Sequence, residues 1–267
     1  MIPTDHVNLD PETYEPLEPE ETRRHLKERP SFTVLHDDEQ VVVLNKSAGI
    51  SSIRERFIPG ISLKEIAEQR FGRLWTVHRI DKETSGVILF ARDAESHRIL
   101  NSQFEQGRAT KIYAAALEGV MAEEEIRIDI PIVPDPAHPG RMRPSARGKE
   151  SLTILRRREV FRGFTYAEAQ PLTGRQHQIR VHCRAVGLPL AVDSFYGNRS
   201  ELLLSSIKRK YKSYDREERP LISRLTLHAE RLTIDHPATE LSVTFEAPLP
   251  RDLRALLSQL RKVAVLR

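Results

Sequence analysis

Residues 78–91 read HRIDKETSGVILFA, a charged turn that leads directly into a run of apolar residues. The run Val87–Ala91 has the length and the β-branched composition of a buried strand. A carboxylate such as Asp81 beside buried structure costs free energy unless it pairs with a cation or contacts a ligand. This stretch therefore predicts a core strand with a functional turn at its amino-terminal end.

A second polar stretch follows almost a hundred residues later, where residues 173–182 read TGRQHQIRVH. Its pattern predicts a helix from about Gln176 to Ala185, which Gly187 ends. Arg180 then has apolar neighbours on that helix, which again favours pairing with an acid or a ligand. The two stretches together predict one site.

The order of the other expected elements indicates the fold class. Strands and helices are mixed without the regular alternation of βαβ units, which predicts an α+β fold with a mixed, largely antiparallel β-sheet flanked by helices and loops. Five prolines between Pro131 and Pro144 predict a loop. Further strands are expected at 41–44, 111–117, 151–156, 164–171, 225–234 and 241–245, and helices after Ser62, between Asp93 and Gly107, and after Pro250.

The composition bounds the class of protein. A chain of 267 residues can form one large domain or two small ones, and 39% apolar with 30% charged residues is typical of a soluble protein. No apolar stretch is long enough to cross a bilayer. The single cysteine, Cys183, excludes an internal disulfide framework and a cysteine-based zinc cluster, and it favours a reducing, cytoplasmic location.

Charge is unevenly distributed along the chain. The net charge is +4, but residues 1–21 contain seven acidic and no basic residues, which leaves +11 on the remainder. Residues 1–27 are therefore expected to be an acidic extension with the composition of a disordered segment. The basic remainder, which includes a charged insertion at 208–219, indicates a polyanionic partner such as nucleic acid. A merely solvated basic surface would have the same composition.

Spacing alone allows several interpretations of Asp81. Its carboxylate could cap the turn by accepting a hydrogen bond from Thr84 or Ser85, or it could act in catalysis. Together with Glu83 it could form the carboxylate pair of a glycosidase. A kinase-like catalytic loop is excluded, because that motif needs His-Arg-Asp and a preceding glycine-rich loop.

Two motifs are specific enough to indicate a family. Residues 78–86 resemble the motif HRLDxxTSG, and residues 173–182 resemble TGRxHQIRVH, the two signatures of the RluA-type pseudouridine synthases. Residues 187–197 are similar to the motif GxPixGDxxYG that follows in that family. Shorter matches are KxY at 111–113 and the opening motif at 43–49, and the blocks occur in family order.

The resemblance covers roughly residues 32–250 and implies a pseudouridine synthase-like fold and an isomerase that acts on RNA. It implies three catalytic residues. Asp81 is similar to the aspartate that acts as nucleophile on the target uridine, and Tyr113 to the tyrosine that packs against the base. Arg180 is similar to the arginine that pairs with the aspartate. Attack at C1′, attack at C6 and assisted elimination remain open as chemical routes.

The resemblance also implies contacts to RNA. Arg79 corresponds to a residue implicated in opening the RNA stack, and His78, Arg175 and His177 are further candidates for contacts to RNA and the flipped base. The implied partner is ribosomal or transfer RNA. Neither an obligate protein partner nor a membrane is expected, and the chain is expected to be a monomer.

No metal or organic cofactor is expected. The family works without either, and the five-residue spacing of His177 and His182 separates their side chains by about 140° on a helix. Residues 28–267 are expected to form one catalytic domain. The chain departs from the family pattern at four positions, where Ile80, Ser47, Gln176 and Ala191 replace Leu, Pro, Thr and Gly.

Two other classes of function remain open from the sequence. The basic body would also suit a non-catalytic RNA-binding protein, although Asp81 and Arg180 are both present. A hydrolase that uses Asp81 and Glu83 would release free uracil.

Overall fold

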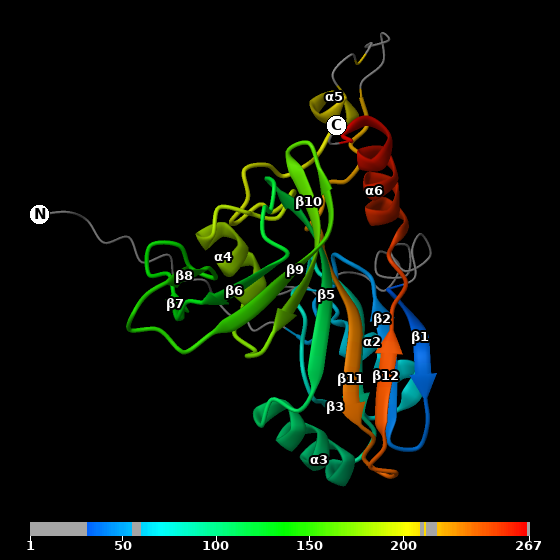
Figure 1. The fold of residues 1–267 in the computed structure, drawn as a ribbon. Coiled ribbons are helices and arrows are strands. Elements are labelled where there is room, and N and C mark those ends of the chain that lie inside the picture. The colour runs from blue at the N-terminus through cyan, green and yellow to red at the C-terminus, as the bar shows by residue number, and fades with distance from the viewer. Residues whose placement is uncertain (1–30, 55–59, 209–210, 212–217, 266–267) are drawn as a thin grey trace, which may run out of the picture.

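The computed structural model describes residues 31–54, 60–208, 211 and 218–265 (Figure 1). The acidic extension expected at 1–27 lies outside the described residues, as does most of the insertion at 208–219. Within the described part of the chain, no helix is long and apolar enough to span a membrane. The boundary of the expected catalytic domain at residue 28 stays a prediction.

One large sheet organises the fold, with strand order β1-β2-β4-β11-β5-β10-β9-β6, while β12 pairs with β11 and β3 with β4. Its pairings are antiparallel except for the short parallel contact between β4 and β11. The predicted α+β fold with a mixed, largely antiparallel sheet is therefore confirmed. The strands are β1 (Phe32–Asp37), β2 (Val41–Lys46), β3 (Trp75–Thr76), β4 (Ser85–Ala91), β5 (Thr110–Glu118), β6 (Glu125–Asp129), β7 (Ile132–Pro134), β8 (Met142–Pro144), β9 (Leu152–Phe161), β10 (Phe164–Pro171), β11 (Leu227–Asp235) and β12 (Ser242–Glu246).

Helices cover both faces of this sheet. Side chains alternate along a strand, so Ala115 and Leu117 of β5 pack with α4, while Ala114 and Ala116 pack with α6. The same alternation along β2 divides its side chains between α3 on one face and α2 on the other. The helices are α2 (Leu63–Phe71), α3 (Ala94–Glu105), α4 (Gln178–Ala185), α5 (Leu204–Ile207) and α6 (Arg251–Val263).

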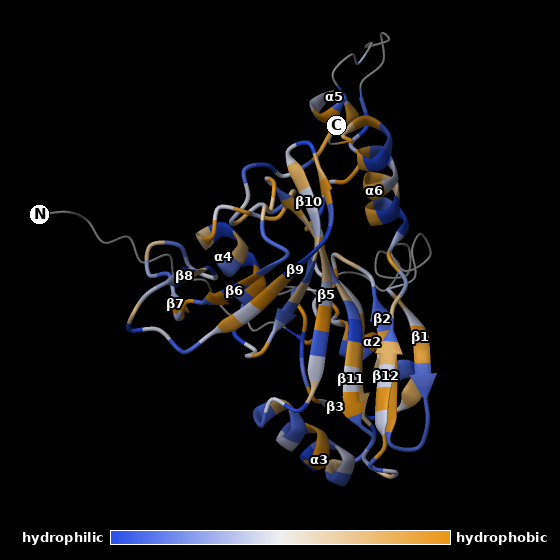
Figure 2. Ribbon diagram, viewed as in Figure 1, coloured by the Kyte–Doolittle hydropathy of each residue, from blue (hydrophilic) through white to orange (hydrophobic). Residues whose placement is uncertain are grey.

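Local sequence signals explain where the helices begin. Ser62 and Glu65 form the capping box expected at the start of α2, and the Asp93 carboxylate accepts the N–H of Ser96 at the start of α3. Helix α6 follows Pro250 and buries a stripe of leucines, and its two sides differ in hydropathy in Figure 2. These helix predictions are confirmed.

The proline-rich segment between Pro131 and Pro144 differs from the sequence-based expectation. It was expected to be a loop, but it contains the antiparallel pair β7 and β8. Pro134 and Pro144 stand at the ends of these short strands, where a missing N–H does not interrupt a central ladder. Strands β1 and β6 were also not predicted.

Gly86 sets how closely β4 approaches β11. Its φ is +116°, and a Cβ atom at this position would lie 2.1 Å from the carbonyl oxygen of Ala229. Only glycine allows both this backbone conformation and this approach. The close approach brings the turn that contains Asp81 next to the start of β11.

We expect Gly86→Ala to lower the free energy of unfolding by about 3 kcal/mol or more, because strain and a backbone clash add. Gly163→Ala is the matched control, since Gly163 also has a positive φ of +77° but an added Cβ would meet nothing within 4 Å. The control should lose only about 1 kcal/mol. Guanidinium unfolding measures both, and equal losses would contradict the role given to the close approach.

Candidate active site

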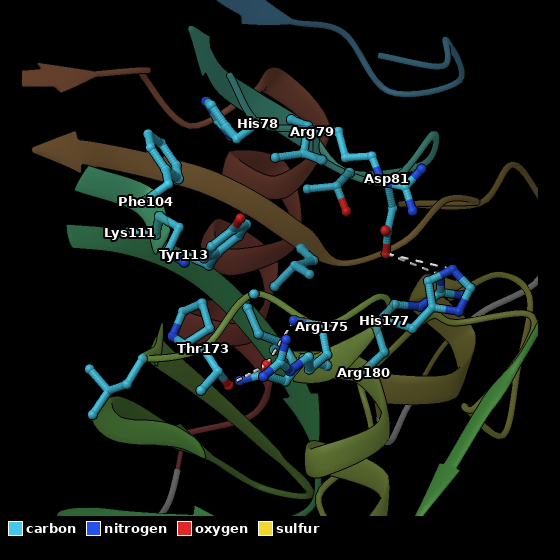
Figure 3. A pocket seen from close by; sticks show the side chains of 18 of the residues that line it. His78, Arg79, Asp81, Phe104, Lys111, Tyr113, Thr173, Arg175, His177 and Arg180 are labelled. Atoms are coloured by element: carbon cyan, nitrogen blue, oxygen red, sulfur yellow. Dashed lines mark hydrogen bonds and ion pairs between the residues drawn. The ribbon is translucent and has the colours of Figure 1, made fainter. Parts of the chain in front are cut away.

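One cavity of about 560 Å³ collects the residues that the two sequence motifs predicted. It lies where the starts of β5 and β11 meet the turn before β4 and the loop before α4. Figure 3 shows these side chains around the cavity. All seven predicted site residues line it, namely His78, Arg79, Asp81, Tyr113, Arg175, His177 and Arg180.

The Asp81 carboxylate faces two basic groups at the cavity wall. Its Oδ2 atom is 3.3 Å from Nη1 of Arg180 and 4.0 Å from Nε2 of His177 (Figure 3). The Asp81 side chain is 25% exposed, whereas that of Arg180 is 6% exposed. The carboxylate is therefore open to a ligand, while its counter-charge lies behind it in the protein.

Arg180 is held mainly by another acid, Asp193. Its Nε and Nη2 atoms donate to the two oxygens of Asp193 at 2.8 Å each, and the Asp193 side chain is 1% exposed. The rings of Phe195 and Tyr196 lie 5.2 and 5.0 Å from the guanidinium carbon. This bidentate geometry fixes the guanidinium and leaves Nη1 directed at Asp81.

Asp193 was not assigned a role from the sequence, although it stands in the motif at 187–197. The signal was an acid in a stretch of otherwise apolar residues, which needs a buried partner. Burial lowers the pKa of Arg180, but the bond to Asp193 and the charge of Asp81 raise it above the usual value. Arg180 therefore stays charged at any physiological pH.

The turn around Asp81 is fixed on both sides by the segment that follows β2. Ser52 Oγ donates to the carbonyl of Ile80 at 2.7 Å and accepts its N–H at 3.2 Å. The carbonyl of Lys82 accepts both Nζ of Lys46 and the N–H of Gly49 at 2.9 Å. Both neighbours of the aspartate are thus tied to the core sheet.

Lys46 is almost fully buried and donates to two further carbonyls, those of Ser47 and Ile50. Burial lowers the pKa of Lys46 to about 7, and the nearby carboxylates of Glu83 and Asp81 act in the opposite direction. Three carbonyl acceptors match the three donors of an ammonium group.

The capping and glycosidase interpretations of Asp81 find no support in this geometry. The N–H of Thr84 donates to the backbone carbonyl of Asp81, not to its carboxylate. Glu83 is not among the residues that line the cavity. Within the described residues, the carboxylate is therefore directed at the cavity and its basic neighbours.

Tyr113 and Lys111 bring β5 into the site. Burial raises the pKa of Tyr113, as does the charge of Asp81, so its hydroxyl stays protonated. Burial lowers the pKa of Lys111, whose Nζ lies 6.0 Å from the ring centre of Phe104. The charged residues that line the cavity are the cations Arg79, Lys111, Arg175 and Arg180 and the acids Asp81 and Glu105.

His177 has an uncommon backbone conformation, with a φ of 53°. Its Nδ1 lies 2.8 Å from the hydroxyl of Tyr196, which in turn accepts the N–H of Met142 at 2.7 Å. The Tyr196 hydroxyl can donate its proton to Nδ1, and in that tautomer the imidazole proton is on Nε2, the atom nearer Asp81. Burial lowers the pKa of His177, although Asp81 opposes this shift.

His78, Arg79 and Arg175 differ in how far they reach into solvent. The Nε2 atom of His78 accepts the N–H of Leu89 at 3.0 Å, and its ring stacks on Phe104 with 4.8 Å between centres. Arg79 and Arg175 are both exposed at the mouth of the cavity. His78 is thus anchored to the sheet, whereas the two arginines are available to a ligand.

His78 predicts a dependence of stability on acid pH. Burial, with a contribution from Lys111, lowers its pKa to about 3, and Nε2 must be unprotonated to accept from Leu89. Its stabilising contribution is therefore complete above pH 6.5 and is lost as the pH falls towards 3. We expect His78→Gln to reduce the loss of unfolding free energy between pH 6.5 and 4.5 by about 2 kcal/mol. The free energy of unfolding of both proteins should be measured with urea at each pH. An equal change with pH in wild type and His78→Gln would contradict this assignment.

A second variant tests the anchoring of Arg180. Asp193→Asn leaves the guanidinium without its buried counter-charge, and we expect a loss of about 3 kcal/mol in the free energy of unfolding. Glu159→Gln is the control, because Glu159 pairs with Arg261 at the surface and should lose less than about 1 kcal/mol. Denaturant titration measures the free energy of unfolding of both variants. If Asp193→Asn loses no more than Glu159→Gln, Asp193 does not anchor Arg180.

Comparison with known proteins identifies the family of this chain. The family described as RNA pseudouridylate synthase matches residues 40–185. The uncharacterized RNA pseudouridine synthase YlyB of Bacillus subtilis is 37% identical over 186 residues, which cover 70% of this chain and 55% of that protein. Ribosomal large subunit pseudouridine synthase D of Neisseria meningitidis is 32% identical over 249 residues, 91% of this chain and 64% of that protein. The chain spans less than two thirds of either relative.

The fold is also shared with a solved structure. Human RNA Pseudouridylate Synthase Domain Containing 4 superposes with a TM-score of 0.64 at 24% identity, covering 85% of this chain and 92% of that chain. This likeness shows a common fold. The family match includes more than half of the 267 residues and both motifs that form the cavity. The chain therefore belongs to the RNA pseudouridylate synthase family.

Proposed function

We propose that this protein is an RNA pseudouridine synthase that isomerises a uridine of a structured RNA to pseudouridine, with Asp81 as the nucleophile. One observation carries this proposal: the Asp81 carboxylate is open to a cavity of about 560 Å³ and is backed by the buried Arg180. The reaction moves the glycosidic bond of the base from N1 to C5, so it needs neither an oxidant nor a second substrate.

The base must leave the RNA stack before it can reach Asp81. Extrusion costs a few kcal/mol. Stacking on Tyr113 at the cavity wall would return about 1–3 kcal/mol. Arg79 is exposed at the mouth of the cavity, where its guanidinium can take the place of the extruded base. These two residues are therefore proposed to hold the flipped state from opposite sides.

Once the base is in the cavity, the ionised carboxylate of Asp81 acts on it. Arg180 stabilises the negative charge of Asp81. Its guanidinium is held in place by Asp193, and it stays charged because Asp193 and Asp81 raise its pKa. Nε2 of His177 lies 4.0 Å from the same carboxylate. Attack at C1′, attack at C6 and assisted elimination all begin from this carboxylate.

The other cations around the cavity suit the RNA backbone. Arg175 is exposed and Lys111 lies on the cavity wall, where both can approach phosphates that flank the flipped nucleotide. His78, anchored on β4, is proposed to shape the cavity that the base enters. The net charge of +11 outside residues 1–21 supports a polyanionic substrate.

The substrate class is proposed to be ribosomal RNA of the large subunit, which is named in the Neisseria relative, with transfer RNA as the second candidate. We further propose that residues 28–267 act as one catalytic domain, that the protein is a cytoplasmic monomer and that it needs no protein partner or cofactor.

Asp81→Asn tests the nucleophile. The variant keeps the shape of the side chain but loses its charge, so pseudouridine formation should fall by roughly 10³-fold or more. Affinity for RNA should stay within about threefold of wild type, since phosphate contacts dominate it. Glu83→Gln, outside the cavity lining, is the control and should keep its activity. Site-resolved pseudouridine mapping on incubated RNA measures the product.

The same experiment separates the competing functions. A non-catalytic RNA-binding protein would bind RNA but form no pseudouridine even as wild type. A hydrolase would release free uracil and would depend on Glu83. Undiminished product from Asp81→Asn would remove Asp81 as the nucleophile.

A further inference from the structure

Three potential metal ligands converge at a place far from the catalytic cavity. His36 of β1, Asp38 in the turn after β1, and His236, directly after β11, meet although 198 residues separate the last two. Oδ2 of Asp38 is 2.6 Å from Nε2 of His36 and 3.0 Å from Nε2 of His236. One ligand atom from each of the three residues falls within 4.8 Å of the other two.

The cluster lies at the opposite end of the strands from Asp81. In the pairing of β2 with β4, Lys46 lies opposite Gly86 at the catalytic end, while Val41 lies opposite Ala91 at the other. Asp38 stands three residues before Val41, in the turn between β1 and β2. Figure 1 shows these two strands. A ligand bound there would touch no residue that lines the cavity.

The Asp38 carboxylate is held in place for its two imidazole neighbours. Its Oδ1 accepts the N–H groups of Gln40 and Val41 at 2.8 Å each, which leaves Oδ2 directed at the histidines. Although burial raises the pKa of Asp38, these hydrogen bonds and those from the histidines lower it to about 2. The carboxylate is therefore ionised at neutral pH.

The two imidazoles are also constrained. The ring of His36 packs on Phe245 of β12 with 5.3 Å between centres, and the side chain of His236 is 10% exposed. The His36 side chain is 39% exposed, so the cluster can be reached from solvent. An ordered carboxylate with two imidazoles, open on one side, is a ligand set that transition metals prefer.

We propose that His36, Asp38 and His236 bind one divalent transition-metal ion of the zinc class, with a solvent molecule as the fourth ligand. Bond lengths of about 2.0–2.2 Å in a tetrahedron separate the ligand atoms by about 3.3 Å. The observed separations from Oδ2, 2.6 and 3.0 Å, are shorter than this, so both imidazoles move away from the carboxylate when the ion binds.

Metal binding changes the tautomer of His236. Its Nδ1 accepts an N–H, so the ring proton is on Nε2 and is directed at Asp38, and coordination through Nε2 moves that proton to Nδ1. For His236 this breaks the contact in which Nδ1 accepts the N–H of Ala238, which is long at 3.3 Å. An ion of charge +2 replaces these hydrogen bonds and joins the β1–β2 turn to the end of β11, so it should stabilise the fold without taking part in catalysis.

The protein also carries a matched control pair. His138 lies 2.9 Å from Asp135, through Nδ1 and Oδ2, but this exposed pair has no third ligand within the described residues. His138→Gln therefore removes a comparable histidine–aspartate contact without touching the proposed site.

Metal-free full-length protein should be titrated with Co²⁺, followed by visible absorption, and with Zn²⁺, followed by calorimetry. We expect one ion per chain with the absorption bands of tetrahedral Co²⁺. Affinity should fall at least about tenfold in His36→Gln and His236→Gln and stay unchanged in His138→Gln. Zn²⁺ at 100 times its Kd should raise the Tm of wild type and of His138→Gln by roughly 5 °C, and that of the cluster variants by much less.

Because His36 is the most exposed of the three ligands, His36→Gln keeps the test valid if the other variant fails to fold. Circular dichroism verifies that it is folded. The absence of stoichiometric binding in wild type, or equal affinity in His36→Gln and wild type, would overturn the proposal and leave a hydrogen-bonded cluster. Neither outcome depends on whether the protein modifies RNA.

Discussion

The site depends on one buried ion pair, between Arg180 and Asp193. A guanidinium that is 6% exposed cannot stand at a cavity wall without a counter-charge, and Asp193 supplies one through two hydrogen bonds of 2.8 Å. Because Nε and Nη2 are occupied by this acid, Nη1 remains for Asp81 at 3.3 Å. The carboxylate of Asp81 is thus stabilised by a group whose position and charge are already fixed.

The fold supplies the second half of this arrangement. Asp81 stands on a turn whose neighbours are tied to Ser52 and Lys46, and that turn leads into the fully buried strand β4. Gly86 lets β4 approach β11 closely, which brings the turn towards the start of that strand. Helices on both faces of the sheet keep these strands in place, so that two motifs distant in sequence face one cavity.

Local sequence patterns predicted many of the helices and strands, whereas contacts between residues far apart in the sequence were not predicted. The capping box at Ser62, the cap at Asp93 and the alternation along β11 each act over a few residues, so they can be read from the sequence. The motifs predicted seven of the residues that line the cavity, because the family resemblance includes them. Asp193 was missed as the main partner of Arg180, because nothing in the spacing shows which of two acids is buried. The cluster at His36 joins segments almost 200 residues apart, which no local pattern reveals.

The central claim is that the fixed guanidinium of Arg180 acts on the charge of Asp81 and not on the binding of RNA. Arg180→Lys tests this most directly, since lysine keeps the positive charge but cannot make the two parallel bonds to Asp193. Single-turnover rates and RNA affinity should be measured on the same preparation. The account predicts a rate reduced by about 10²-fold or more with a Kd within about threefold of wild type. A rate equal to that of wild type, or a loss confined to Kd, would contradict it.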